Sequence, residues 1–194
     1  MIKNSFGVIM ERCKWCNLKN ELYVKYHDEE WGVRNFDERY LFEMFILESF
    51  QAGLSWECVL NKRENFRKAY DNFDIDKICL YDDKKVRELM NNKEIIRNKL
   101  KINASINNAK IYKEIANEYG TFYNYLKKYA GEKTIYENDK TTNSISDSIS
   151  KDLISRGMKF VGSTIIYSYL QAIGIINSHF DYCFMYKGDN YGVK

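Results

Sequence analysis

The sequence contains no proline at all and only two histidines among its 194 residues. Because proline interrupts helices and the alternation of apolar and polar residues that marks strands is scarce, we expect an all-α fold. The chain also lacks any run of about 18 apolar residues that could cross a bilayer. Its first residues do not have the pattern of a signal peptide. These absences favour a cytoplasmic protein with no membrane partner.

The chain has little net charge and an odd number of cysteines. A charge of +3 is too small to indicate a charged partner, and five cysteines do not suit a disulfide framework. In a reducing compartment, cysteines more often bind metals or lie buried as free thiols. Apolar residues make up 45% of the chain, which is long enough for one hydrophobic core. We expect a single globular domain over residues 1–194, with residues 1–9 as an N-terminal extension and residues 184–194 as a flexible tail.

Charge is nevertheless distributed unevenly along the chain. Residues 21–48 hold eight acids and three bases, whereas residues 84–113 hold nine bases and two acids. A basic band of this kind can follow a phosphate backbone, although a solvated helix face gives the same pattern.

The most informative segment predicts a sharp corner between two helices. Apolar residues recur at helical spacing over residues 41–46, after Asp37, which suits an N-cap. Gly53 can end this helix in a left-handed turn, and Ser55 can cap a second helix that continues to Tyr70.

Three side chains at this corner suit a binding site. Leu54 lies at the tip, and Glu48 on the first helix is within reach of the indole of Trp56. A carboxylate beside a large aromatic ring is suited to a planar ligand. The alternative is that Glu48 is solvated, Leu54 makes a loop contact and Trp56 belongs to the core.

A second helix pair is predicted within residues 146–178. One helix ends at Gly157, and five residues lead to another helix that Gly174 closes. The start of the second helix, at Gly162, can attract a phosphate, and Lys159 adds a positive charge nearby. An ordinary helical hairpin has the same pattern. Elsewhere we expect helices beginning at Asp74, over residues 86–90, over residues 95–119 and from Phe122, and a surface loop over residues 133–146.

The few histidines and cysteines include a pair with metal-ligand spacing. His179 and Cys183 are four residues apart, which places them on one side of a helical turn. Cys13, Cys16 and His27 are further possible ligands. By spacing alone, Cys13 and Cys16 complete the simplest set of four for a structural Zn²⁺ site, and buried thiols are the alternative.

Three motifs, taken together, resemble the bacterial 3-methyladenine DNA glycosylase I family. The likeness extends in order from Met10 to Cys183. The motifs are ERCKW with YHDEEWG, then LESFQAGLSW, then KFVG followed by His179 and Cys183. The resemblance implies helix-hairpin-helix DNA repair enzymes that hydrolyse the N-glycosidic bond of 3-methyladenine in double-stranded alkylated DNA.

The resemblance also implies roles for individual residues. The structural zinc ligands fall on Cys13, His27, His179 and Cys183, so that His27 replaces Cys16 in the set derived from spacing. The base-contacting residues fall on Glu48, Tyr26 and Trp56, and the pocket is lined by Tyr23, Trp15 and Trp31. Gly53 and Leu54 would enter the gap that a flipped base leaves. The phosphate contacts of Lys159 and Gly162 rest on the shape of the predicted helix pair. Departures from the family pattern are the presence of Cys16, and Ser178 and Arg34 where the family often has an acid and a proline.

Two further positions predict an enzyme that does not cleave the strand. Strand-cleaving relatives use a lysine at the place of Thr164, and many relatives have an essential aspartate at the place of Asn177. A hydroxyl forms no Schiff base, so we expect a monomeric, monofunctional glycosylase that relies on a cationic leaving base. The alternatives are a non-catalytic, zinc-stapled DNA-binding module and a glycosylase for a different damaged base.

Overall fold

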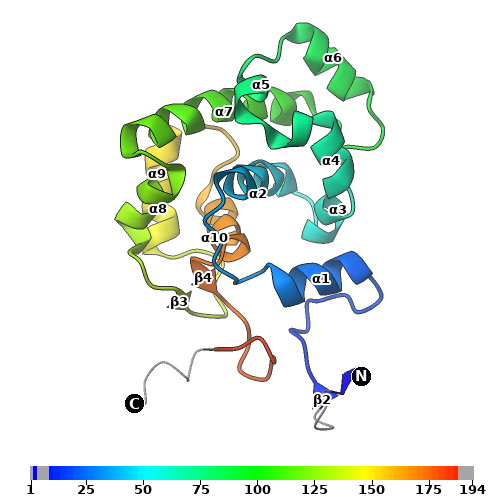
Figure 1. Cartoon of the computed structure of the whole chain (residues 1–194), viewed down its shortest axis with the longest axis vertical. Coiled ribbons are helices and arrows are strands. Elements are labelled where there is room, and N and C mark those ends of the chain that lie inside the picture. The colour runs from blue at the N-terminus through cyan, green and yellow to red at the C-terminus, as the bar shows by residue number, and fades with distance from the viewer. Residues whose placement is uncertain (1, 4–8, 188–194) are drawn as a thin grey trace.

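The computed structural model describes residues 2–3 and 9–187, and this part of the chain is mostly helical (Figure 1). It holds ten α-helices, one short 3₁₀ helix and four strands of two residues each. The predicted all-α class therefore agrees with the structure. The helices are α1 (Glu21–Glu29), α2 (Glu38–Gln51), α3 (Trp56–Leu60), α4 (Arg63–Ala69), α5 (Ile75–Cys79), α6 (Asp83–Asn91), α7 (Lys99–Tyr119), α8 (Phe122–Ala130), α9 (Ser144–Ser155) and α10 (Ser163–Ala172), with η1 (Asp71–Phe73) between α4 and α5.

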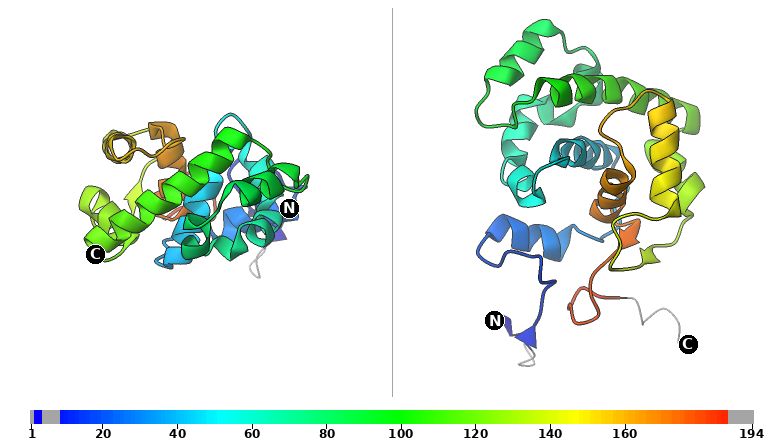
Figure 2. Two further views of the ribbon diagram at one scale, coloured as in Figure 1. Left: turned by 90° about the horizontal axis from the view of Figure 1, so that it is seen from above. Right: turned by 180° about the vertical axis from the view of Figure 1, so that it is seen from behind.

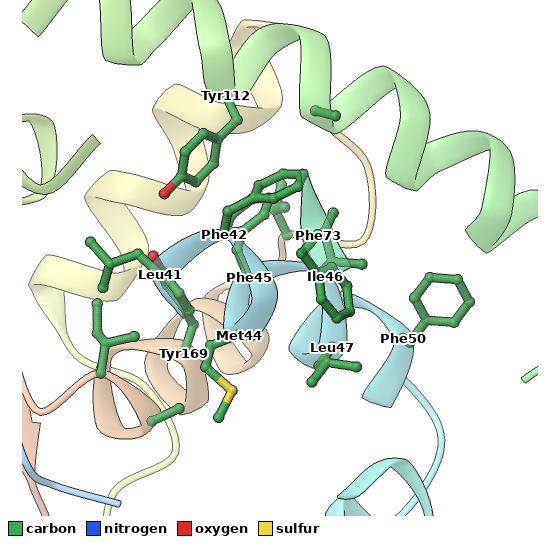
Figure 3. Packing of buried hydrophobic residues seen from close by; sticks show 14 of the residues in the cluster. Leu41, Phe42, Met44, Phe45, Ile46, Leu47, Phe50, Phe73, Tyr112 and Tyr169 are labelled. Atoms are coloured by element: carbon green, nitrogen blue, oxygen red, sulfur yellow. The ribbon is translucent and has the colours of Figure 1, made fainter. Parts of the chain in front are cut away.

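Helix α2 forms the centre of the core. It is buried on all sides over residues 41–50, and α7, α8 and α10 pack around it (Figures 2 and 3). The rings of Phe45, Tyr112 and Tyr169 meet there at close range, with Phe45 and Tyr169 edge to face at 5.4 Å between centroids. Because α2 is fixed so firmly, Glu48 near its end has a fixed position too.

The predicted corner between two helices is present. The Asp37 side chain accepts the Tyr40 N–H, and the Ser55 side chain accepts the Cys58 N–H, so both act as N-caps. Gly53 has a φ of +78°, the left-handed conformation that glycine adopts without strain. The chain thus reverses direction between α2 and α3.

The second helix of the corner is shorter than predicted. It stops at Leu60, and a new helix, α4, begins at Arg63. The break arises because the Lys62 N–H bonds to the carbonyl of Val59, three residues back, which tightens the turn. Asn61, a weak helix former, also accepts a hydrogen bond from Asn20.

Two other predicted boundaries were wrong. The long helix begins at Lys99, four residues later than expected, because Asn98 caps it. The expected surface loop over residues 133–146 contains strand β3 (Ile135–Tyr136), which pairs in parallel with β4 (Ile176–Asn177), and its end already belongs to α9. A capping box between Asn143 and Ser146 starts α9.

Parts of the two predicted terminal segments are also described. Strand β1 (Ile2–Lys3) pairs antiparallel with β2 (Ile9–Met10), while residues 1 and 4–8 of the predicted extension lie outside the described residues. Near the other end, the Phe184 N–H donates to the carbonyl of Glu11. The remainder of the predicted tail, residues 188–194, also lies outside. Among the described helices, none combines the length and the apolar composition needed to span a membrane.

Candidate active site and metal centre

A cavity of about 470 Å³ opens beside the end of α2. Its wall is built by α1, α2, α3 and α10, together with the segments that follow β3 and β4. All six side chains that the resemblance assigned to base binding line it: Trp15, Tyr23, Tyr26, Trp31, Glu48 and Trp56. The structure brings these residues together, and their roles in binding a base remain predictions.

Glu48 is the most unusual polar group in this wall. It is 3% exposed, and among the described residues its Oε2 atom has no hydrogen-bond partner. Burial raises the pKa of Glu48 to about 8. Burial therefore favours the protonated form of this carboxyl group.

Aromatic rings form a large part of the remaining wall. Tyr26 and Trp56 lie 5.2 Å apart between ring centroids, and Trp15 contacts both Tyr23 and Trp31 at 5.3 Å and 4.7 Å. The Trp56 Nε1 atom is buried, and no described residue accepts its hydrogen bond. Buried polar groups normally have partners. A planar ligand between these rings could supply partners for both the indole N–H and the Glu48 carboxyl.

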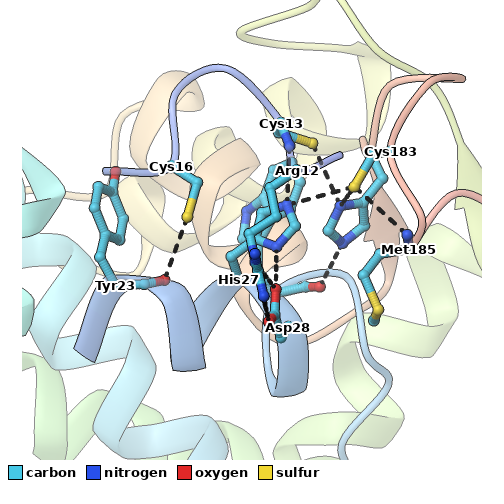
Figure 4. Close-up of polar contacts among 10 residues, drawn as sticks. Arg12, Cys13, Cys16, Tyr23, His27, Asp28, Cys183 and Met185 are labelled. Carbon is cyan, nitrogen blue, oxygen red and sulfur yellow. Dashed lines mark hydrogen bonds and ion pairs between the residues drawn. The ribbon is translucent and has the colours of Figure 1, made fainter. Parts of the chain in front are cut away.

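A second cluster of functional side chains lies next to Trp15 and Trp31. The ligand atoms of Cys13, His27, His179 and Cys183 all lie within 4.8 Å of one another, and all four residues are buried (Figure 4). The Sγ atom of Cys183 is 3.5 Å from His27 Nε2 and 3.4 Å from His179 Nδ1. A tetrahedral zinc ion with ordinary Zn–S and Zn–N bonds separates sulfur and nitrogen ligands by about 3.6 Å. The cluster therefore fits such an ion.

The outer nitrogens of both imidazoles are already held. His27 Nδ1 contacts the Asp28 carboxylate at 2.7 Å, and His179 Nε2 contacts the carbonyl of Trp31 at 3.0 Å. Arg12 in turn forms a bidentate ion pair with Asp28. Such partners fix the ring orientation so that the other nitrogen faces the centre of the cluster, as hydrogen-bond partners do for the histidine ligands of known metal sites.

Cys16 lies outside this cluster, although spacing alone made it a ligand. Its thiol is buried and contacts the carbonyl of Tyr23 at 3.9 Å. The four residues that converge are those implied by the family resemblance, with His27 in place of Cys16.

The residues assigned to DNA contact lie on two loops outside the cavity. Leu54, at the corner between α2 and α3, is 40% exposed, and a side chain added at Gly53 would meet no atom within 4 Å. On the turn between α9 and α10, Lys159 is exposed and Gly162 is the N-cap of α10, with no side-chain hydrogen bond. Phe160 in this turn has a φ of +57°.

The chain matches the family model described as methyladenine glycosylase over residues 15–186. It belongs to the methyladenine glycosylase family. DNA-3-methyladenine glycosylase 1 of Escherichia coli (strain K12) is 41% identical, with 93% of this chain and 99% of the relative covered. DNA-3-methyladenine glycosylase of Haemophilus influenzae is 36% identical, with 89% and 96% covered.

Solved structures agree with this membership of the methyladenine glycosylase family. A crystal structure of 3-methyladenine DNA glycosylase I superimposes with a TM-score of 0.86 at 38% identity, covering 91% of this chain and all of the other. The Staphylococcus aureus enzyme, whose structure concerns 3-methyladenine recognition, has a TM-score of 0.82 at 32% identity, with 85% and 91% covered.

Sequence reasoning missed part of the methyladenine glycosylase cavity. Its wall also contains Ser168 and Gln171 on α10, polar residues three apart in the mainly apolar second half of the helix, which was a usable signal. Nothing in the sequence pointed to the segment after β3. The missed lining residues are Gln51, Asp139, Lys140, Thr141, Ser168, Gln171, Ser178 and Phe180.

The position predicted to replace a catalytic aspartate has another task. The Asn177 side chain donates to the carbonyl of Gly32 and accepts the N–H of His179, both at 3.2 Å, so it helps to fix the backbone at one member of the Cys/His cluster. Lys159, which sequence analysis took as the nearby amine, lies outside the cavity wall, whereas Lys140 lies in it and pairs with Glu137.

Proposed function

We propose that the protein is a monofunctional DNA glycosylase that removes 3-methyladenine from alkylated double-stranded DNA. The main support is the buried carboxyl of Glu48 in the cavity wall, whose Oε2 atom has no partner among the described residues, in a chain of this family. One chain supplies the described cavity wall, which supports action as a monomer. The enzyme would share the cytoplasmic compartment of the DNA that it repairs.

The chemistry of the damaged base explains the cavity. Adenine methylated at N3 is cationic while it is attached to the sugar, so it is already a good leaving group. Its positive charge lowers the pKa of Glu48 on entry, and the resulting carboxylate accepts a hydrogen bond from the exocyclic amino group. Guanine has a carbonyl oxygen at that position, which cannot donate a hydrogen bond to the carboxylate. Stacking on Trp56 adds about 1–3 kcal/mol.

We further propose that Cys13, His27, His179 and Cys183 hold one structural Zn²⁺. Four nitrogen and sulfur ligands make a closed site with no open position for substrate. The ion would supply folding free energy rather than chemistry, because it joins the segment before α1 to the segment after β4. Trp15 and Trp31, which flank these ligands, would be fixed in the cavity wall by the same ion.

Chromatography of the bases released from methylated duplex DNA tests the function. We expect 3-methyladenine as the main product and little release from unmodified purines. A gel run without alkaline treatment should show intact strands, and borohydride should trap no protein–DNA adduct, since the only lysine among the described cavity residues is ion-paired.

Other outcomes would point to other functions. Tight binding of abasic or distorted duplex without any released base would indicate a non-catalytic DNA-binding module. Efficient release of a neutral lesion, such as uracil, would indicate a different substrate class. A trapped adduct that disappears in Lys140→Gln would overturn the monofunctional mechanism.

Leu54 provides a separate prediction about base flipping. We propose that it fills the gap left by the extruded base, as apolar wedges do in other DNA-bending proteins. Leu54→Gly should weaken binding to duplexes with an abasic site roughly 10-fold or more, because a buried leucine side chain contributes about 1.5–3 kcal/mol. Affinity for free 3-methyladenine, measured by quenching of tryptophan fluorescence, should stay within twofold. An equal loss of free-base affinity would mean that Leu54 belongs to the cavity wall.

A further inference from the structure

Helix α7 holds both loops that the proposed function places on DNA. At the corner, Lys101 Nζ donates to the carbonyls of Phe50 at 2.8 Å and Ala52 at 2.6 Å. At the turn between α9 and α10, the Asn108 side chain accepts the Lys159 N–H at 3.0 Å and donates to the Lys159 carbonyl at 2.8 Å. Figure 2 shows α7 running across α2 towards this turn.

Lys101 is an unusual residue for a lysine in this position. It is 7% exposed, and the only described acceptors of its ammonium hydrogens are the two backbone carbonyls. Burial lowers the pKa of Lys101, and its ammonium lies 5.9 Å from the ring of Phe160. A buried ammonium is costly unless it is compensated, so the carbonyls at the end of α2 are what keep it there.

Lys101 compensates the partial negative charge at the C-terminal end of α2. The carbonyl end of a helix carries about half a negative charge, and the last turn of α2 contains no basic residue. This end lies beside Leu54, at the place where the protein must approach negatively charged phosphates. The ammonium group of Lys101 therefore reduces the repulsion between the carbonyl end of α2 and the DNA phosphates, at the place where Leu54 enters the duplex.

The contacts made by Lys101 and Asn108 on α7 also fix the distance between the two loops. Lys101 and Asn108 are seven residues apart, which places them on one face of the helix and roughly 10 Å apart along its axis. Asn107 adds a hydrogen bond to the carbonyl of Gly157 at 2.9 Å. The spacing between Leu54 and the turn at Lys159 is thus fixed by one rigid element.

We propose that Lys101 is a positioning residue for DNA binding: it fixes the corner so that Leu54 enters the duplex while the turn at Lys159 contacts the backbone, and it neutralises the end of α2 that faces the phosphates. This inference rests on the proposed function. It predicts a residue that lies outside the cavity and nevertheless controls the affinity for damaged duplex.

The test compares Lys101→Met with Lys101→Arg and with Lys110→Met. Lys110 lies exposed on the same helix, so its replacement removes the same charge away from the corner. We expect Lys101→Met to bind a duplex with an abasic site about 10- to 100-fold more weakly, the usual effect of losing hydrogen bonds to a charged group. Lys101→Arg should recover most of the affinity, and Lys110→Met should lose less than threefold.

Two readouts separate positioning from a general effect on the fold. Affinity for free 3-methyladenine should stay within twofold in Lys101→Met, because the cavity does not contain this residue. In a Leu54→Gly background, the same replacement should cost much less, because the wedge through which it acts is gone. Equal losses for free base and duplex, or the same loss in both backgrounds, would overturn the proposal.

Measurements on the wild-type protein distinguish a failure of the Lys101 proposal from a failure of the proposed function. If wild type binds abasic duplex but releases no base, the glycosylase activity is wrong, and the Lys101 variants still report on DNA binding. If wild type releases 3-methyladenine and Lys101→Met binds duplex equally well, only the role of Lys101 is wrong.

Discussion

His179→Ala is expected to abolish stoichiometric zinc binding and to leave the protein largely unfolded at 37 °C. Among the described residues the proposed site has no spare cysteine or histidine, since the Cys16 thiol is turned towards Tyr23. The binding free energy of a structural zinc ion is on the order of 10 kcal/mol, comparable with the whole stability of a typical domain. Metal content by mass spectrometry and thermal unfolding by circular dichroism measure the two effects.

Cys16→Ala is the matched control for this experiment. It removes a buried cysteine only three residues from Cys13, so it tests whether any nearby thiol matters. We expect one zinc ion per chain to be retained and the midpoint of unfolding to change little. Full zinc retention in His179→Ala, or loss of zinc in Cys16→Ala, would contradict the proposed ligand set.

Glu48→Gln is expected to lower kcat/KM for 3-methyladenine excision by roughly 10- to 100-fold, the effect of replacing a hydrogen bond to a charged group by a neutral one. Glutamine keeps an acceptor oxygen but cannot balance the cationic base. Glu48→Ala should be worse, because it removes the acceptor as well. Binding to abasic DNA should change little in either variant, since no base then reaches Glu48.

The dependence of excision on pH follows from the same carboxyl group. Burial raises the pKa of Glu48 to about 8, so its carboxylate form becomes more abundant as pH rises through that value. Wild-type kcat/KM, which reports ionisations of the free enzyme, should therefore rise towards pH 8, and that rise should disappear in Glu48→Gln. Asp139→Asn, which removes the other acid among the described cavity residues, is the control and should keep the rise.

The free energy of unfolding should fall as pH rises, whereas kcat/KM should increase. Because the folded-state pKa of Glu48 is raised, the native protein binds this proton more tightly than the unfolded chain does. The stabilisation is complete below the ordinary glutamate pKa of about 4.5 and is lost as pH rises through about 8. Glu48→Gln should therefore be more stable than wild type at pH 9, as denaturant unfolding can show. Equal pH profiles of the two proteins would contradict the raised pKa.

Six of the cavity-lining residues followed from the family resemblance, and the other eight were missed. The sequence was sufficient for most of the helices, and the reasons are local. Asp37, Ser55 and Gly53 act through bonds within a few residues, so the corner could be predicted. The break at Asn61 depends on a hydrogen bond from Asn20, and the pairing of β3 with β4 joins segments some forty residues apart. Neither leaves a periodic pattern in the sequence.

The metal cluster shows where spacing alone was misleading. Cys13 and Cys16 have the spacing of a familiar ligand pair, but Cys16 faces the carbonyl of Tyr23. His27, fourteen residues from Cys13, occupies the fourth position because α1 carries it back beside the segment before that helix. The family resemblance identified this residue, whereas the chemistry of the individual residues left it open.

The distance along the chain between the cluster's members has a consequence for the newly made protein. Cys13 and His179 are separated by 166 positions, so the ribosome releases the first ligand long before the last. At about 5–20 residues per second, Cys13 and His27 leave the ribosome on the order of ten seconds before His179 and Cys183. During that time the proposed zinc ion would lack two of its four ligands, and the cavity wall would lack Ser178 and Phe180. The proposed metal site and the cavity would therefore be completed together, in one late step of synthesis.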